Sequence, residues 1–362
     1  MRDESLATWA LAKTEGVGSI IFSQLVGKFG SAAAVLEASG EELAKSEIVN
    51  DSLARKIQGI EDWERIHQEF EKGKPAGTEF VPLASDLYPA KLRNIADPPP
   101  YLFFIGDPGI LNKPAIAVVG SRKPSDYGLR MTARIAGELA QSGIVIISGL
   151  AYGIDGAAHQ AALDAGGLTA AVFGCGLDTI YPAGHSSLAR RITETGCLIS
   201  EFEKGIKPER FNFPVRNRIV AGLAEGVLVI EAAEKSGALV TALLALEQNR
   251  EVLALPGSVD SKLSYGPNNL IKQGATAITS AQDIFDYFKW HRSAAEKSKA
   301  PDLSNLSKEE QIIYNCLTVQ PIHLDEINRK NGLGHGKTAE ALLNLEMKGF
   351  IIRKPGNYVV KA

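Results

Sequence analysis

Six short apolar runs between residues 80 and 290, separated by helical patterns, constrain the fold of this 362-residue chain most strongly. Most of these runs end in glycine, serine or proline. Short, continuously apolar runs are typical of strands buried on both faces, and the intervening helices make them βαβ units. The pattern therefore predicts an α/β fold with a parallel sheet covered on both faces. The predicted strands are Ile116–Gly120, Ile144–Ser148, Thr169–Phe173, Leu198–Phe202, Val227–Glu231 and Val252–Leu255.

Two other regions flank this predicted sheet. Residues 1–75 have the spacing of one-sided helices and end in a stretch rich in glycine, proline and lysine, which indicates an N-terminal helical domain. Residues 291–306 have the composition of a linker. Residues 307–362 predict a winged helix, because three helical patterns precede two strands. These are Lys308–Leu317, Leu324–Lys330, Lys337–Lys348, Phe350–Arg353 and Tyr358–Val360.

The composition excludes several classes of protein. A 45% apolar and 22% charged chain is typical of globular proteins, and its length predicts two or three domains. No run approaches the ~18 apolar residues of a membrane helix, and Met1–Glu4 lacks the basic start of a signal peptide. Three cysteines without a CxxC pair argue against a disulfide framework or a cysteine-rich zinc site. We therefore expect a cytoplasmic protein that does not contact membranes.

Charge is distributed unevenly, although the formal net charge is only −3. Residues 1–70 contain 7 basic and 12 acidic side chains, a net of −5, whereas residues 183–218 contain 7 basic and 4 acidic ones, a net of +3. A polyanionic partner would need a local basic patch, and the second stretch is the candidate. Gly16-Val17-Gly18 resembles the turn of a helix-hairpin-helix or SAM-like module. The acidic surroundings favour a packing or protein-interaction role for that turn over a grip on DNA.

Several predicted strands end in residues suited to an anion. Because the carboxyl ends of parallel strands share one edge of the sheet, these residues are expected to lie near one another. Glycine allows close backbone approach, serine offers a hydroxyl, arginine a bidentate fork, and a following helix free N–H groups. No GxGxxG fingerprint is present, and no cofactor is predicted. The residues concerned are Gly120, Ser121 and Arg122, then Gly149 and Tyr152, and finally Ser236 and Gly237.

The run Phe211–Arg218 is the most informative local pattern. An extended aromatic segment beside arginines could stack bases and clamp phosphates, as in proteins that bind single strands. Alternatively, the phenylalanines pack in the core and the arginines pair with Glu201, Glu203 or Glu231, since unpaired buried arginines are costly.

Asp155 and His159 lie one helical turn apart and raise the possibility of general-base or metal chemistry. No third ligand or nucleophile lies nearby in the sequence. The favoured interpretation is a helix-capping aspartate and a packed histidine, and no metal site or catalytic residue is predicted.

In these motifs, the chain resembles the DNA-processing protein A family, DprA or Smf, of bacterial natural transformation. The resemblance covers roughly residues 85–290, and the flanking helical and winged-helix regions also occur in relatives. The motifs are Val119–Arg122, Ser148–Asp155, Gly174–Asp178 with Tyr181-Pro182, Phe213–Arg218, Ser236–Thr241 and Leu255–Gly257.

The resemblance implies a Rossmann-like domain over residues 80–290 that binds single-stranded DNA without sequence preference and without catalysis. It further implies protection of incoming DNA, loading of the RecA recombinase and a homodimer. The implied phosphate contacts are Arg122, Arg216, Arg218 and Lys204, with Asn217 between the two arginines. Tyr152 replaces a basic residue of some relatives, and Tyr152 or Phe202 would stack a base. Two alternatives are a Rossmann-like nucleotide-binding or nucleotide-hydrolysing enzyme and a winged-helix transcription regulator.

Overall fold

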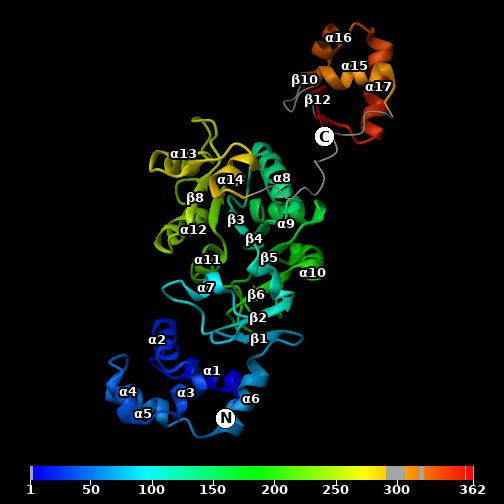
Figure 1. The fold of residues 1–362 in the computed structure, drawn as a ribbon. Helices are drawn as coiled ribbons and strands as arrows, with labels where there is room; N and C mark the ends of the chain where they lie inside the picture. The colour runs from blue at the N-terminus through cyan, green and yellow to red at the C-terminus, as the bar shows by residue number, and fades with distance from the viewer. Residues whose placement is uncertain (1–2, 291–305, 318–321, 355, 362) are drawn as a thin grey trace. The chain divides into compact units, whose positions relative to one another are not determined.

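The computed structural model describes residues 3–290, 306–317, 322–354 and 356–361 (Figure 1). Within these residues the chain forms two compact units that divide near residue 293. Each unit has a hydrophobic core of its own. The predicted linker at 291–306 lies almost wholly outside the described residues, and the two units are treated separately below.

The first unit begins with short helices, most of which start at a residue whose side chain caps the helix. Asp3, Ser31, Ser39, Asn50 and Asp62 each cap the helix that follows by accepting a backbone N–H. The helices are α1 (Glu4–Lys13), α2 (Ser19–Phe29), α3 (Ala32–Glu37), α4 (Gly40–Lys45), α5 (Asp51–Gln58) and α6 (Trp63–Gly73). Helices α2 and α5 bury spaced residues on one face, as the periodicity predicted, whereas α1 buries the five consecutive residues 7–11 and is covered all round.

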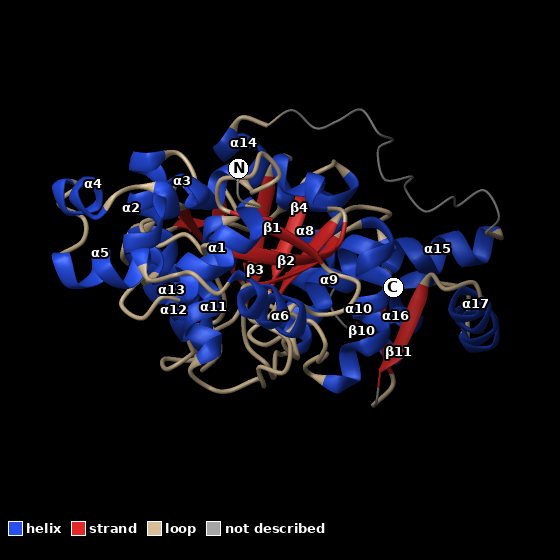
Figure 2. Cartoon of the chain, turned by 90° about the horizontal axis from the view of Figure 1, so that it is seen from below, coloured by secondary structure: helices blue, strands red, loops and turns tan. Residues whose placement is uncertain are grey.

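A single twisted sheet forms the centre of this unit (Figure 2). All six predicted strands are present and parallel, which confirms the predicted α/β class. The strand order is β1-β2-β6-β5-β4-β3-β7-β8-β9. The six are β3 (Ala115–Val119), β4 (Val145–Ser148), β5 (Thr169–Val172), β6 (Cys197–Ser200), β7 (Gly226–Val229) and β8 (Glu251–Ala254).

Three further strands extend the sheet beyond the prediction. At one edge β2 (Tyr101–Gly106) pairs antiparallel with β6, and β1 (Glu79–Pro82) pairs antiparallel with β2. At the other edge β9 (Thr276–Ala277) pairs parallel with β8. Pro82 is the last residue of an edge strand, where the missing N–H of proline is tolerated.

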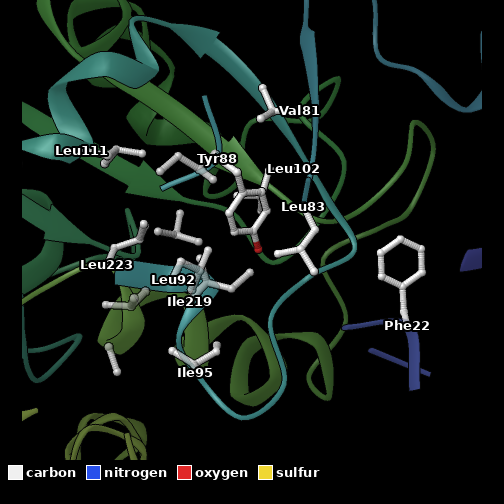
Figure 3. Close-up of a cluster of buried hydrophobic side chains, with 14 of the residues drawn as sticks. Phe22, Val81, Leu83, Tyr88, Leu92, Ile95, Leu102, Leu111, Ile219 and Leu223 are labelled. Atoms are coloured by element: carbon white, nitrogen blue, oxygen red, sulfur yellow. The ribbon is translucent and has the colours of Figure 1, made fainter. Parts of the chain in front are cut away.

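Helices cover both faces of the sheet, as the continuous apolar strands require. On β3, Ile116 and Val118 belong to the cluster beneath α8 (Asp126–Gln141), α9 (Ile154–Asp164) and α14 (Ala281–Phe288). Ala117 and Val119 belong to the cluster beneath α11 (Asn212–Gly222) and α12 (Gly237–Glu247). Figure 3 shows part of that second cluster, in which Leu92 of α7 (Ala90–Arg93) lies beside Ile219 and Leu223. The remaining helices are α10 (Ser186–Thr195), α13 (Tyr265–Lys272) and the 3-10 turns Pro108–Asn112 and Ala183–His185.

The strand order reverses next to β3. From β3 the chain adds β4, β5 and β6 on one side, and then returns to place β7 on the other side of β3. In open α/β sheets the crevice outside the carboxyl ends of the strands at such a reversal is the usual ligand site. The motifs after β3 and β7 therefore lie where binding is expected.

The second unit has the helices and strands predicted for a winged helix. Three helices pack on an antiparallel sheet of order β10-β12-β11, around buried Ile313, Ile327, Leu342 and Val359. The sequence reading missed β10. The elements are α15 (Lys308–Cys316), β10 (Ile322–His323), α16 (Leu324–Asn331), α17 (His335–Met347), β11 (Ile351–Lys354) and β12 (Tyr358–Lys361).

Helices long and apolar enough to cross a membrane are absent from the portion of the chain that the structure describes.

Candidate functional site

A cleft of about 760 Å³ opens at the carboxyl ends of β3 and β4, at the point where the strand order reverses. The N-terminal ends of α11 and α12 close its other sides. The structure brings together seven of the residues singled out from the sequence. These are Gly120, Arg122, Gly149, Arg216, Asn217, Ser236 and Gly237.

Arg122 extends from the loop after β3 into this cleft, and its side chain is exposed. Its guanidinium carbon lies 5.4 Å from the centre of the Phe213 ring, a cation–π distance. Among the described residues, no carboxylate forms an ion pair with Arg122, so its charge is available to a ligand. Neighbouring Ser121 does not line the cleft, and its hydroxyl accepts a hydrogen bond from the Lys123 N–H at 3.1 Å.

Arg216 forms the floor of the cleft and is only 4% exposed. It donates to the carbonyl oxygen of Gly149 at 2.8 Å, to the carbonyl oxygen of Val172, and through Nε to Asn217 Oδ1 at 3.1 Å. Burial lowers the pKa of Arg216 to about 10, an effect that nearby Asp155 opposes, so the guanidinium stays charged at neutral pH. Arg216 is therefore a fixed, desolvated positive charge.

Glycine is required at position 149 by the approach of this arginine. A Cβ on Gly149 would lie 2.4 Å from Arg216 Nη2 and 2.6 Å from Cζ. At the end of β3, a Cβ on Gly120 would similarly lie 2.6 Å from Ile154 Cγ1. Both glycines thus allow the close packing that brings the strand ends to the cleft.

The start of α12 supplies the opposite wall. Ser236 is the N-cap, and its hydroxyl accepts from the Ala238 N–H at 3.3 Å, as expected for a helix N-terminus at this strand end. The space beside Gly237 is open. The remaining N–H groups of the first turn and the helix dipole favour an anion here.

The cleft carries a net positive charge. Within the described residues, its lining contains three arginines, Arg122, Arg210 and Arg216, and one carboxylate, Asp155. Asp155 accepts hydrogen bonds from the Gly149 and Ala151 N–H groups at 3.1 and 3.4 Å. Burial raises the pKa of this carboxyl, while Arg216 opposes the shift. The arrangement suits several phosphate groups.

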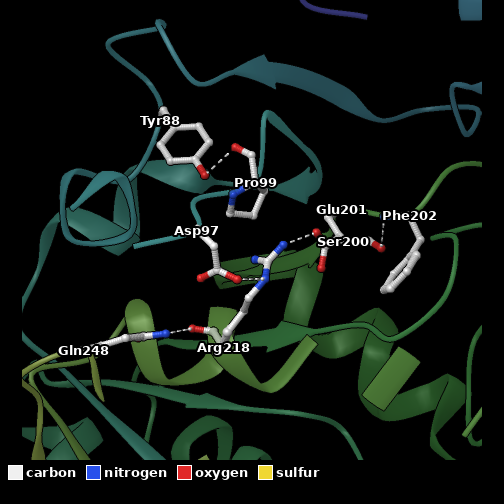
Figure 4. A network of polar contacts seen from close by, with 8 residues as sticks. All are labelled: Tyr88, Asp97, Pro99, Ser200, Glu201, Phe202, Arg218 and Gln248. Atoms are coloured by element: carbon white, nitrogen blue, oxygen red, sulfur yellow. Dashed lines mark hydrogen bonds and ion pairs between the residues drawn. The ribbon is translucent and has the colours of Figure 1, made fainter. Parts of the chain in front are cut away.

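Arg218 lies outside the cleft, in an ion-pair network (Figure 4). Its Nη2 lies 2.5 Å from Glu201 Oε2 and its Nε lies 3.2 Å from Asp97 Oδ2. Burial raises the pKa of Glu201, and the guanidinium of Arg218 opposes that rise. Of the two interpretations of Arg218, phosphate contact or structural ion pair, the contacts therefore support the ion pair, with Glu201 as the partner.

The other two acids considered as arginine partners have different contacts. Glu231 accepts from the Ser125 N–H at 2.8 Å and from its hydroxyl, and so fixes the start of α8. Glu203 pairs with Lys13 of α1.

Two further predicted residues, Tyr152 and Lys204, do not line the main cleft. Tyr152 is 52% exposed, packs edge-on against His185 at 5.0 Å, and lines a smaller adjoining pocket with Arg122 and Phe213. Lys204 is exposed and lines neither pocket, and its backbone N–H donates to the Gly73 carbonyl at 2.8 Å.

The prediction of an extended segment at Phe211–Arg218 is wrong, because α11 already begins at Asn212. Pro214 is the third residue of this helix, where a backbone N–H has no intrahelical partner and its loss costs little. The helix separates the two aromatics. Phe213 lines the cleft, whereas Phe211 is 66% exposed and does not.

Sequence reasoning missed three cleft residues, namely Tyr181, Pro208 and Arg210. Arg210 belongs to the basic stretch 183–218 and directly precedes Phe211, which is a signal that could have identified it. Tyr181 lies 5.8 Å from Phe213 between ring centres and belongs to a motif that had been noted.

His159 is a packed core histidine, as favoured from the sequence. It is fully buried, and its Nδ1 lies 2.6 Å from Thr169 Oγ1. Burial, with His185 and Arg216 nearby, lowers the pKa of His159 to about 3.

The predicted helix cap at Asp155 is wrong, because Gly153 is the N-cap of α9 and the Asp155 carboxylate accepts from the loop N–H groups of Gly149 and Ala151 instead. The described residues contain no group of three or more His, Cys, Asp or Glu side chains able to hold a metal ion.

Comparison with known proteins gives matches over both units. A family model described as DNA recombination-mediator protein A matches residues 79–289, and a DprA winged helix domain model matches residues 297–357. Protein Smf of Escherichia coli K12 is 42% identical over 286 residues, which cover 77% of this chain and 76% of that protein. DNA processing protein DprA of Bacillus subtilis is 46% identical over 211 residues, which cover 58% and 71%.

Two solved structures also match. The X-ray structure of DNA processing protein A from Streptococcus pneumoniae has a TM-score of 0.70 at 36% identity, covering 80% of this chain and 100% of that one. The protein from Helicobacter pylori, whose structure addresses its single-stranded DNA binding mode, has a TM-score of 0.52 at 33% identity. That match covers 56% of this chain and 92% of the other.

Proposed function

Because the chain belongs to the DNA recombination-mediator protein A family, we propose that its cleft binds single-stranded DNA. The observation that carries the proposal is the cleft itself. Arg122 is exposed and unpaired within the described part of the chain, Arg216 is fixed beneath it, and the α12 N-terminus faces both. The relative from Helicobacter pylori binds single-stranded DNA, which supports the same ligand here.

The strand's phosphates would contact Arg122, Arg210, Arg216 and the first turn of α12. Contacts from arginines and a helix N-terminus to phosphate oxygens carry no sequence information, so binding through them would not depend on sequence. A base would stack on Phe213 or Tyr152, and such a contact contributes about 1–3 kcal/mol. In this proposal Arg218 supports α11, and Ser121 and Lys204 flank the strand's path.

Duplex DNA suits this cleft less well than a single strand. The Phe213 ring lines the cleft and the Tyr152 ring is 52% exposed beside it, so both surfaces are open to an unpaired base. Bases in a duplex are already stacked and paired, and unstacking them costs a few kcal/mol.

We further propose that the protein protects the strand and transfers it to the RecA recombinase in the cytoplasm, as a binding protein and not an enzyme. The family description as a recombination mediator supports this role. An exposed apolar stripe on α12, formed by Val240, Leu243 and Leu246, supports the proposal of a homodimer. The proposed domains are 1–75, 80–290 and 307–362, joined by the segment 291–306.

The proposal is tested by fluorescence anisotropy with labelled single-stranded and duplex oligonucleotides of matched sequence. We expect preferential binding of single strands, with similar affinity for unrelated sequences. Failure of both DNA forms to bind at moderate salt would overturn the proposal.

A second candidate ligand is a free nucleotide, because a cleft of about 760 Å³ is within the usual range for small-molecule sites. Competition separates the two candidates. If a mononucleotide displaces the labelled strand at micromolar concentration, the cleft is a nucleotide site. If displacement requires concentrations far above the strand's Kd, the extended strand is the ligand.

A further inference from the structure

The loop at residues 201–211 connects β6 to α11 and brings Pro208 and Arg210 to the cleft. Its first part is held by the N-terminal helices. The Glu203 carboxylate pairs with Lys13 of α1 and accepts from the Tyr101 hydroxyl at 3.1 Å. One residue on, the Lys204 N–H donates to the carbonyl of Gly73, the last residue of α6, at 2.8 Å.

The surface that holds this loop is firmly packed. Trp9 of α1 is 2% exposed, stacks on Tyr101 of β2 at 5.6 Å, and lies 5.4 Å from Phe70 of α6. Phe70 also packs edge-on against Phe80 of β1 at 5.0 Å, so α6 lies against the sheet edge (Figure 1). A Cβ on Gly73 would lie 2.4 Å from Trp9 and 3.4 Å from Glu203. The helices therefore present a rigid anchor to the loop.

The rest of the loop is tied to neighbouring segments. The Gly205 N–H donates to the Asp178 carboxylate at 3.1 Å, and the Ile206 carbonyl accepts from the Gly176 N–H at 3.0 Å. The side chain of Asn212, the first residue of α11, donates to the Lys207 carbonyl at 3.1 Å. Arg210 lies in the short segment between Lys207 and Asn212, in a loop whose first contact with the helices is the anchor at Glu203.

We propose that the N-terminal helical region is a positioning element for the DNA cleft, which acts through Glu203 on Arg210. This inference rests on the proposed binding of single-stranded DNA. It gives a role to a segment whose net charge over residues 1–70 is −5, which is unsuited to a direct grip on a polyanion. Glu203 is accordingly a positioning residue, and we assign it no contact with DNA.

The direction in which one substitution changes the affinity for DNA distinguishes a positioning role of Glu203 from a purely electrostatic one. Glu203→Gln removes a negative charge near a proposed polyanion site, so electrostatics alone predicts tighter binding. Positioning predicts weaker binding, because the pair with Lys13 is lost. If the loop then keeps its binding arrangement one fifth of the time, apparent affinity falls about fivefold.

Glu209→Gln is the matched control. Glu209 is an exposed acid of the same loop, and the described residues give its carboxylate no ion-pair partner. Its removal changes the charge equally without loosening the anchor, and affinity should rise about twofold or less at low salt.

A double-mutant cycle measures the coupling between Glu203 and Arg210 in DNA affinity. A general loss of stability on substitution of Glu203 would not produce such coupling. If Glu203 acts by placing Arg210, Glu203→Gln should weaken binding much less in an Arg210→Ala background than in the wild-type background. Gly73→Ala tests the same anchor from α6, because the added Cβ would clash with Trp9 and disturb the packing that holds the loop. Gly27→Ala, with open space at its Cβ position, is its helical control.

All variants are compared by anisotropy with one labelled single strand and by thermal unfolding of the full chain. Weaker binding by Glu203→Gln and Gly73→Ala, unchanged or tighter binding by both controls, and coupling to Arg210 would support the inference. Binding by Glu203→Gln at or above wild-type affinity, or full additivity with Arg210→Ala, would overturn it. If wild type itself binds no single strand, the proposed function fails, and that outcome is distinct from the other two.

Discussion

Arg218→Met tests whether this arginine stabilises the fold or contacts the ligand. The side chains of Arg218 and Glu201 are only 10% and 14% exposed, so their ion pair is largely buried. Removing one partner of such a pair leaves a buried, uncompensated charge and typically costs 3–5 kcal/mol, whereas Asp97, at 40% exposure, adds little. At about 2 °C per kcal/mol for a large domain, the melting temperature should fall by roughly 6–10 °C.

Calorimetry on the full chain measures this loss, and Glu201→Gln in the Arg218→Met background should recover most of it. Because burial raises the pKa of Glu201, protonation favours the folded state, and the variant should regain stability as the pH falls towards 5. The salt dependence of single-strand binding should stay as in wild type. This reasoning would be refuted if Arg218→Met reduced the slope of log Kd against log salt by about 0.7 and left the melting temperature unchanged. Arg218 would then be a phosphate contact.

Three other predictions follow from particular contacts. Gly149→Ala places a Cβ against Arg216, so both stability and single-strand affinity should fall, as measured by thermal unfolding and anisotropy, while Gly27→Ala should leave affinity unchanged. Phe213→Leu removes a stacking surface and should weaken binding by about 1–3 kcal/mol, whereas an unchanged Kd would exclude stacking there. The pKa of His159 is about 3 when folded and about 6.5 when unfolded, so the unfolded state binds the extra proton below pH 6.5. Stability should therefore fall as pH decreases from 6.5 towards 3, by about 2 kcal/mol at pH 5, and equal melting of wild type and His159→Gln across this range would contradict the assignment.

The predictable part of the fold is the part encoded by local patterns. Each of the six strands reads as an apolar run because both of its faces are buried. The three outer strands were missed for physical reasons. β1 ends in a proline, β9 has two residues, and β2 is antiparallel with no helix linking it to β1. The apolar run of β2 was nevertheless visible in the sequence.

The site residues that directly follow predicted strands could be predicted from the sequence. Gly120, Arg122, Gly149 and Ser236 meet because parallel strands end at one edge of the sheet. The roles of the other site residues depend on which distant residues their side chains contact. The sequence does not show which of several possible partners each side chain uses. Arg216 and Arg218 lie two residues apart on α11, yet their side chains reach different surroundings.

The central claim is that the cleft beside β3 binds the phosphates of a single strand through Arg122. The most direct measurement is the slope of log Kd against log salt for wild type and Arg122→Ala, with Lys123→Ala as the neighbouring-charge control. The account predicts weaker binding by Arg122→Ala and a slope smaller by about 0.7, with a much smaller change for the control. Equal affinity and equal slope for wild type and Arg122→Ala would contradict it.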